Sequence, residues 1–565
     1  MPQDDSCWRV CSRGFYSCHW KEPSDNKRKH ACCWFSVVTL ASLLSLCWMY
    51  ICLVTFNDRD DVNWQGFTKL KRWVNWFMVV IIISAVLTSY CVLLLLFALF
   101  QVALREPLDL HWLHKIFLVL GVIFITLGVT GFSLQWRQEW PTLPLSLLAT
   151  GPFLQFGAAG ALILLSPFIF RGIHMAPGKR SKFLITAVFL VVSVAIFLCP
   201  LFIWSPCLIE LHLPEKPKLI GHRGAPMLAP ENTMMSFNRS IACGVTAFET
   251  DVQLSKDRIP FLMHDHNPGF LLRTTNVKEK FPDKDFSHGT NLTWEELQSL
   301  NAGEWFLKTD PFHSVFELSQ EETETARNQT IPSLLQLLNL AKLHNISLIF
   351  DLYSPDKDND TEDTVDTILR SGIDPSQVLW LPPVKREYVR KTAPGFIQVY
   401  NDSEMLKEKG GNYLNVKYSK LSMEDISNNR KAGVRVNMWV VNERWLFSLL
   451  WCAGVSSVTT NSCHLLKDMD RPDWFMSLET YKIIWITVDI ASIVIMIGLY
   501  IFQWKTHCSC QRKGTKKQRN NTSARNEKEL SCFLPTSSPD CSRRSVLPKT
   551  DVRLCLNCTN GLDLD

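Results

Sequence analysis

Two histidines and three acidic residues stand in or directly after short apolar runs between residues 218 and 352. His222 follows "KLIG", His264 follows "PFLM" and Asp351 follows "SLIF". Glu249 and Asp251 are two residues apart in "FETDV", so on a β-strand both side chains point to the same face. If these runs are parallel strands, their carboxyl ends meet at one edge of the sheet, and all five side chains converge there.

The acidic residues suit a hard divalent cation. Calcium and magnesium prefer oxygen ligands from carboxylates, carbonyls and water. Glu249, Asp251 and Asp351 would supply three carboxylates to one site. We therefore predict a divalent metal, calcium or magnesium, held by these three residues.

The two histidines and a neighbouring arginine extend this site toward hydrolysis. Imidazole titrates near neutral pH, so His222 and His264 can act as acid and base. Arg223 carries a forked guanidinium that fits a phosphate oxygen. Each residue alone is common in a purely structural role, but their joint placement beside a metal predicts phosphodiester cleavage.

The region that carries these residues, 207–480, alternates short β-rich runs with helical stretches. Repeated strand–helix units favour a parallel sheet, and about eight units in ~250 residues favour a TIM-type (β/α)8 barrel. A doubly wound open sheet is the alternative. The candidate strands number one more than a barrel needs: Lys218–His222, Ala247–Leu254, Pro260–Met263, Ser347–Leu352, Gln377–Leu381, Phe396–Tyr400, Tyr413–Lys417, Val434–Val441 and Ser457–Thr460. Helices are expected at Pro230–Cys243, Pro332–His344, Glu362–Arg370, Lys385–Thr392, Met423–Lys431 and Arg444–Cys452.

Residues 266–330 interrupt this alternation. The stretch is polar, poor in strand patterns and contains Trp294, Trp305 and Phe306. We expect an insertion that lies over one end of the barrel, after the third strand.

Six long apolar runs flank the α/β region. A helix needs ~20 apolar residues to cross a bilayer, and five such runs within 31–206 are hard to bury in a soluble core. We predict a multi-pass α-helical membrane protein, with an arm at 1–30, a sixth span at 483–502 and a disordered polar tail at 503–565. The six runs are Ala31–Phe56, Trp76–Phe100, Ile116–Leu134, Leu145–Phe170, Phe183–Ser205 and Ile483–Phe502.

Basic residues predict the orientation, because Lys and Arg collect in cytosolic loops. The N-terminal arm, the loop at 171–182 and the C-terminal tail are all basic, and six spans place them on one side. Both termini are then cytosolic, the domain at 207–480 is extracellular, and the plasma membrane is the expected location. The first loop, with Lys69, Lys71 and Arg72, disagrees mildly. The net charge of +5 gives no support to nucleic-acid binding.

Glycosylation motifs and cysteines agree with that orientation. Cys207, Cys243, Cys452 and Cys463 lie in the outer region, where disulfides can form, but their pairing is not readable from sequence. Asp489 lies inside the sixth span, where a relay role and simple pairing with another span both stay open. Six outer asparagines are candidate glycosylation sites: Asn238, Asn291, Asn328, Asn345, Asn359 and Asn401.

Several stretches resemble the glycerophosphodiester phosphodiesterase family. They are "GHRGAPMLAPENT" (221–233), "FETDVQLSKD" (248–257), "PFLMHD" (260–265), "RTTN" (273–276), "LNAGEWF" (300–306), "IPSLLQLL" (331–338) and "WVVN" (439–442). The resemblance covers the whole outer domain. Six spans with the domain between the fifth and sixth also resemble the vertebrate membrane subgroup, as do "HWLHK" (111–115), "GPFLQFGA" (151–158) and "WLFSLLWCAG" (445–454).

The resemblance implies a TIM-barrel enzyme that hydrolyses glycerophosphodiesters to an alcohol and a glycerol phosphate. It implies that His222 and His264 are the acid–base pair and that Glu249 and Asp251 bind the metal. The third metal ligand of the family is usually the Glu of an "E-x-K" strand end, where this chain has "DLY" with Asp351 and Tyr353. The missing basic residue at Tyr353 puts substrate preference in question.

We therefore expect a metal-dependent ecto-phosphodiesterase. Its substrate would be a glycerophosphodiester, of the glycerophosphoinositol or glycerophosphocholine type, or a glycosylphosphatidylinositol-anchored protein in the adjacent lipid. A signalling or interaction protein with weak or lost catalysis is the second reading, suggested by Tyr353 and the basic tail. A transporter, suggested by six spans and Asp489, is the third.

Overall fold

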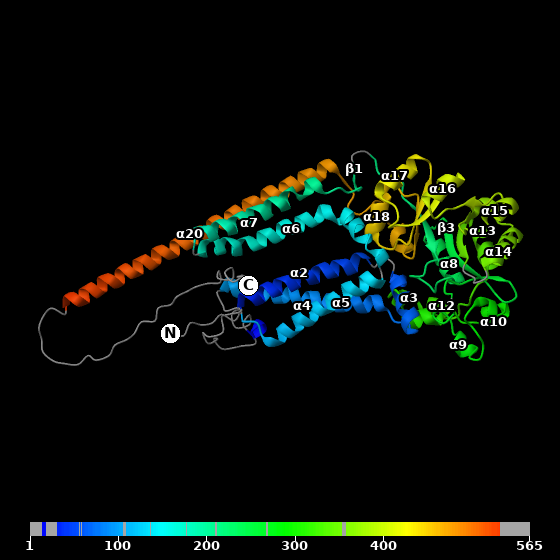
Figure 1. Cartoon of the computed structure of the whole chain (residues 1–565), viewed down its shortest axis with the longest axis horizontal. Helices are drawn as coiled ribbons and strands as arrows, with labels where there is room; N and C mark the ends of the chain where they lie inside the picture. Colours follow the sequence, from blue (N-terminus) through cyan, green and yellow to red (C-terminus); the bar gives the residue numbers. More distant parts are fainter. Residues whose placement is uncertain are drawn as a thin grey trace, which may run out of the picture.

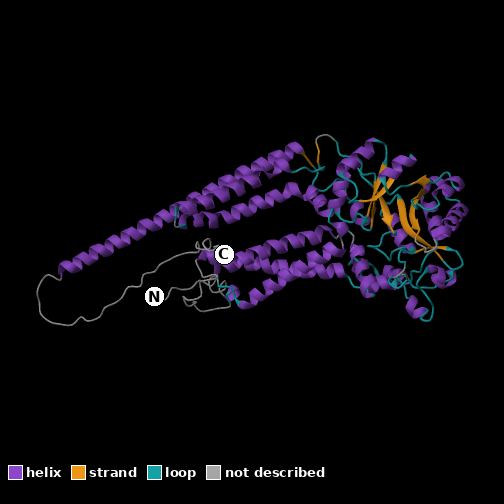
Figure 2. Cartoon of the chain, in the orientation of Figure 1, coloured by secondary structure: helices purple, strands orange, loops and turns teal. Residues whose placement is uncertain are grey.

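The computed structural model describes residues 14–17, 31–55, 57, 59–104, 109–135, 137–176, 178–209, 212–266, 269, 271–352 and 357–531. Long helices occupy one end of the molecule, and an α/β domain occupies the other (Figure 1). All strands except a short pair at the junction lie in that domain (Figure 2).

Six helices are long and apolar enough to cross a membrane, as predicted. Because the bilayer core offers no water to backbone groups, a spanning segment must satisfy its hydrogen bonds within the helix. The helices are α2 (Ala31–Thr55), α4 (Trp76–Leu104), α5 (Trp112–Gln135), α6 (Thr142–Met175), α7 (Lys179–Leu198) and α20 (Leu478–Ser531). The apolar spans within them are Trp34–Thr55, Trp76–Leu99, Trp112–Leu134, Thr142–His174, Lys179–Phe202 and Leu478–Lys505.

These helices form two groups, α2, α4 and α5 in one and α6, α7 and α20 in the other (Figure 1). The Tyr50 hydroxyl of α2 joins the groups, at 2.8 Å from Ser146 and 3.0 Å from Thr150 of α6. Asp489 of α20 accepts a hydrogen bond from the side-chain amide of Gln155 in α6, at 3.0 Å. The ionisable residue predicted inside the sixth span is thus paired with another span.

The α/β domain is a parallel barrel, which overturns the open-sheet alternative. Its eight strands run in the order β7-β6-β5-β3-β2-β10-β9-β8, and a bridge between Tyr400 and Leu414 joins the two edge strands. The strands are β2 (Lys218–His222), β3 (Ala247–Leu254), β5 (Ser347–Leu352), β6 (Val378–Trp380), β7 (Ile397–Gln398), β8 (Tyr413–Lys417), β9 (Arg435–Trp439) and β10 (Ser457–Thr460).

The ninth candidate strand lies outside the barrel. β4 (Pro260–Leu262) pairs antiparallel with β3, with Val252 opposite Leu262, and an isolated bridge joins Phe261 to Ser333. Strand β3 extends past the barrel rim, and β4 folds back along this extension. The prediction that "PFLM" ends at the mouth like a barrel strand was therefore wrong in direction, although His264 still arrives there.

Helices cover the outside of the barrel, and their apolar faces meet Phe248, Leu348 and Trp380 in the main core. The helices are α8 (Met234–Ala242), α13 (Leu334–His344), α14 (Lys357–Ser371), α15 (Arg386–Thr392), α16 (Ser403–Lys409), α17 (Met423–Lys431), α18 (Arg444–Ala453) and α19 (Cys463–Lys467). Sequence patterns did not indicate α16 and α19. The insertion forms a second, small core, in which Leu297 and its apolar neighbours pack with Phe261 of β4. It contains α9 (Val277–Lys280), α10 (Trp294–Gln298), α11 (Glu304–Thr309) and α12 (Gln320–Arg327).

Several contacts join the barrel to the helical part. Glu139, before α6, accepts hydrogen bonds from Lys417 and from the Tyr418 hydroxyl. The short strands β1 (Leu208–Ile209) and β11 (Met476–Ser477) pair in parallel where the chain enters and leaves the domain. A further helix, α3 (Arg59–Leu70), follows the first span and was not predicted. The α/β domain is thus joined to the helical part both through the segment before α6 and through the β1–β11 pair.

Candidate active site

The predicted site residues meet at the carboxyl ends of neighbouring strands. His222 ends β2 and lies opposite Glu249 of β3, while Asp251 lies opposite Asp351 of β5. Glu249 and Asp251 share one face of β3, because side chains alternate along a strand. The structure therefore brings these four residues to one mouth, as the sequence predicted.

His222 is buried and held through one ring nitrogen. Its Nδ1 is 2.6 Å from the Asn461 side-chain oxygen, and its Nε2 is 3.8 Å from Glu249. Since that oxygen only accepts, Nδ1 carries the proton and Nε2 carries the lone pair. Burial lowers the pKa of His222 well below its ordinary value, and the charge of Arg223 acts in the same direction. The ring is therefore neutral at physiological pH.

His264 reaches the mouth from β4, and its Nδ1 lies 3.1 Å from the Asp265 carboxylate. A carboxylate accepts only, so Nδ1 again donates the hydrogen bond. His264 also acts on the other mouth residues, because its charge is among those that shift the pKa of His222 and of Asp351. The two imidazoles thus belong to one electrostatic cluster.

Arg223 follows β2 in the left-handed conformation, with φ +52°. Its backbone N–H lies 3.1 Å from the Glu249 carboxylate, its Nε 3.4 Å from Asp251, and its Nη1 3.3 Å from Glu231. Gly224 comes next, with φ +88°, and a Cβ there would lie 2.5 Å from Ser236 of α8. Only glycine permits this close turn, which holds Arg223 beside the carboxylates.

The carboxylate cluster carries unfavourable negative charge. Burial, then the charge of Asp251, raises the pKa of Glu249 well above its ordinary value. The same two causes raise the pKa of Asp351 to about 7. Among the residues that the structure describes, no three His, Cys, Asp or Glu side chains converge closely enough to ligate one ion. The all-oxygen donor set and its crowded charge nevertheless suit a divalent cation in chemistry.

Three further residues of the site were not predicted. Glu231 and Arg273 are buried and joined by two hydrogen bonds, one of them 3.1 Å, and Arg273 also holds Asp265 at 2.7 Å. Asn461 orients His222. Glu231 lies in the stretch "PENT" and Arg273 in the stretch "RTTN", but only the fold shows that these two charged side chains meet.

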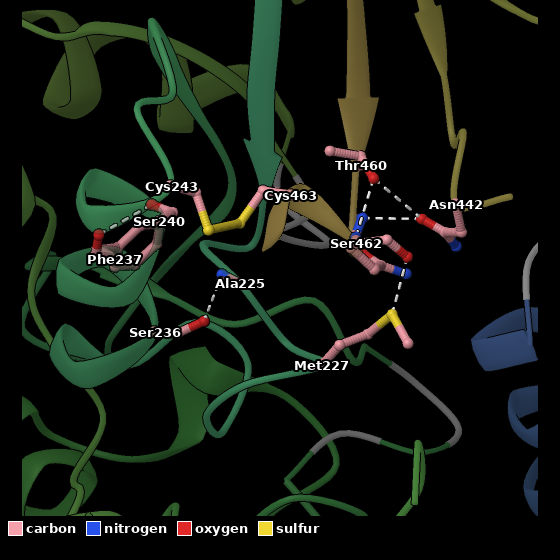
Figure 3. The surroundings of a disulfide bond; sticks show 11 residues. Ala225, Met227, Ser236, Phe237, Ser240, Cys243, Asn442, Thr460, Ser462 and Cys463 are labelled. Carbon is pink, nitrogen blue, oxygen red and sulfur yellow. Dashed lines mark hydrogen bonds between the residues drawn. A yellow bond between two sulfur atoms is a disulfide. The ribbon is translucent and has the colours of Figure 1, made fainter. Parts of the chain in front are cut away.

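A disulfide lies at the seam between the first and last strand–helix units of the barrel. Cys243, after α8, pairs with Cys463 at the start of α19, and so joins the first and last strand–helix units of the barrel (Figure 3). The Ser462 hydroxyl also contacts the Met227 sulfur at 2.8 Å in the same seam. The seam holds β2, which carries His222, against the turn that carries Asn461. The other outer cysteines, Cys207 and Cys452, pair with each other.

Tyr353 lies outside the described residues. Of the candidate glycosylation sites, Asn238, Asn328, Asn345 and Asn401 are exposed and Asn291 is half-buried, while the side chain of Asn359 lies outside the described part.

Comparison with known proteins identifies the family. The profile of the Glycerophosphoryl diester phosphodiesterase family matches residues 222–374, and a second profile of the same description matches 435–462. A mouse protein named glycerophosphoinositol inositolphosphodiesterase GDPD2 is 41% identical over 514 residues, or 88% of this chain and 94% of the relative. The chain belongs to the glycerophosphodiester phosphodiesterase family. It is therefore an enzyme that hydrolyses phosphodiesters.

Other members of the family extend the match across the spans. Chicken glycerophosphodiester phosphodiesterase domain-containing protein 5 is 40% identical over 505 residues, covering 87% of this chain and 84% of the relative. A solved phosphodiesterase from Oleispira antarctica covers 44% of this chain and 95% of its own, at 23% identity and a TM-score of 0.36. The matches to the mouse and chicken relatives therefore include both the membrane helices and the barrel.

Proposed function

We propose that this enzyme hydrolyses glycerophosphodiesters at the barrel mouth, with His222 as base and His264 as acid. His222 is neutral and presents its lone pair on Nε2, which suits proton abstraction. His264 donates through Nδ1 to the Asp265 carboxylate, whose negative charge lies beside the ring that would protonate the leaving alcohol. The pairing of these two imidazoles with different partners is the observation that carries the proposal.

The reaction would begin on the substrate's own glycerol hydroxyl. His222 would remove the proton from the hydroxyl next to the phosphate, and that oxygen would attack phosphorus. His264 would protonate the departing alcohol oxygen, leaving a cyclic phosphate. Water would then open the ring with the two histidines in exchanged roles, while Arg223 faces a phosphate oxygen.

A divalent cation, calcium or magnesium, fits the same mouth in this proposal. Glu249, Asp251 and Asp351 would hold it, and it would offset the charge of the phosphate. The raised pKa of Glu249 and of Asp351 supports this assignment, because a cation would relieve their repulsion.

The substrate is proposed to be a glycerophosphodiester presented near the membrane. The name of the mouse relative favours glycerophosphoinositol over glycerophosphocholine. Contacts between the barrel rim and the first loop support a site close to lipid, which also suits a glycosylphosphatidylinositol anchor. The disulfides and exposed sequons support an extracellular domain at the plasma membrane with cytosolic termini.

Turnover by the detergent-purified full chain, in calcium or in magnesium, tests the assignment. His222→Ala and His264→Ala should each lower the turnover number about 10²–10⁴-fold, the usual contribution of acid–base catalysis. His344→Ala, at an exposed position in α13, is the matched control and should keep wild-type turnover. Wild-type turnover in either mouth variant would refute the assigned pair.

A further inference from the structure

We propose that Trp64, in the first loop of the membrane part, is a positioning residue for His264. This inference rests on the acid role proposed above. Trp64 belongs to α3, and its ring meets the His264 ring edge to face, with centroids 5.9 Å apart and planes at 76°. A residue about 200 positions away in sequence therefore limits how the imidazole can turn.

The loop that carries Trp64 is fastened at both ends to the α/β domain. Asn57 accepts hydrogen bonds through its side-chain oxygen from the backbone N–H groups of Asn442 and Glu443, at 2.9 and 3.2 Å. Its side-chain amide donates to the Val440 carbonyl. At the other end, Asn75 donates to the Pro311 carbonyl at 3.1 Å. The loop that carries Trp64 is thus held by both the barrel and the insertion.

The same loop also encloses the arginine behind His264. The Arg273 guanidinium lies 5.6 Å from the Trp64 ring, 4.9 Å from Trp73 and 5.2 Å from Trp305. Aromatic faces attract a cation, and the attraction grows when water is excluded. Arg273 in turn holds Asp265, which bonds His264. The loop therefore contacts His264 directly through Trp64, and it also contacts the Arg273 side chain that holds the Asp265 partner of His264.

The chain segment just after His264 closes against Trp64 as well. Gly269 lies so near that a Cβ there would be 2.6 Å from the Trp64 ring and 3.2 Å from Phe67. The His264 segment and α3 thus meet with no space for a side chain. The imidazole thus contacts Asp265 at Nδ1 and the Trp64 ring at the same time, and both contacts restrict its rotation.

The test compares steady-state kinetics of the full chain with glycerophosphoinositol. Trp64→Leu should lower kcat about 10–100-fold and keep KM within about threefold, because a small misplacement of a catalytic group slows chemistry more than binding. Trp64→Phe, which keeps an aromatic ring, should stay within about threefold of wild type. Trp204→Leu removes an exposed tryptophan that follows the fifth span, and it is the control for loss of an indole.

Each outcome decides the proposal. Unchanged kcat in Trp64→Leu overturns it, and so does a rise in KM alone, which would make Trp64 a substrate contact. If Trp64→Leu does not give a folded species by size exclusion, Asn57→Ala decides, because it loosens the loop without altering the surroundings of His264. This variant should lower kcat with KM unchanged, and wild-type kcat overturns the proposal. His264→Ala runs in parallel: wild-type turnover there refutes the proposed function itself.

Discussion

The spans and the barrel differ in the side chains that they expose. Large apolar residues of the spans, such as Phe183 at 75% and Val191 at 68%, point outward, because lipid is their solvent. The barrel buries large aromatic side chains such as Phe248, Phe350 and Trp380, and it gathers charges at one rim. An apolar span depends on few polar contacts with its neighbours, whereas each buried charge at the rim requires an oppositely charged or hydrogen-bonding partner from elsewhere in the chain. Removing a polar partner should therefore cost much in the barrel and little in the spans.

The largest effect is expected from Arg273→Ala in the barrel. The change leaves Glu231 and Asp265 buried without their main cation, and breaking a buried ion pair costs about 3–5 kcal/mol. Arg370→Ala, at an exposed pair with Asp366, should cost about 0–1 kcal/mol. Unfolding monitored by tryptophan fluorescence in detergent measures both, and equal losses would contradict the buried cluster.

The second largest effect is expected from loss of the disulfide at the barrel seam. Replacing both Cys243 and Cys463 by serine removes a link across 220 residues and should destabilise the domain by roughly 2–5 kcal/mol. Cys47→Ser, at an unpaired exposed cysteine of α2, is the control in the spans and should change little. A similar unfolding temperature for the cysteine pair variant and wild type would argue against the disulfide.

Acid should weaken the barrel through the same charges. Burial alone would raise the pKa of Glu231, but Arg273 and Arg223 hold it below its ordinary value. A depressed pKa contributes stability above the unfolded value of about 4.3, and this stability is lost as pH falls through the lower folded value. The unfolding temperature should therefore drop below about pH 4, and Glu231→Gln should flatten that drop. A pH profile identical in both proteins would exclude this source.

The smallest effect is expected inside the membrane. Gln155→Leu removes the hydrogen bond to Asp489, and such bonds between spans average about 0.6 kcal/mol. Turnover and unfolding temperature should stay near wild type, with Leu154→Ala as a lipid-facing control in α6. Loss of activity in Gln155→Leu without loss of stability would favour the relay role considered for Asp489.

Local patterns predicted much of this architecture. Ala247–Leu254, Ser347–Leu352, Tyr413–Lys417 and Ser457–Thr460 are strands with the predicted bounds. Short apolar runs mark them, because a barrel strand is buried on both faces. The direction of β4 was missed, since a run of three residues carries no information on which neighbour it joins. Helix α3 was missed because its sequence is polar, and its stability comes from docking on a domain encoded later in the chain.

The sequence by itself determined six spans, an α/β barrel and the set of mouth residues, because apolar length, periodicity and residue chemistry are local properties. Only the tertiary structure decided which charged side chains meet. It also decided that His222 pairs with Asn461, that His264 pairs with Asp265, and that Trp64 contacts His264. Those contacts join segments tens to hundreds of residues apart. Their energies depend on burial and on exact neighbours in space, which no local pattern carries.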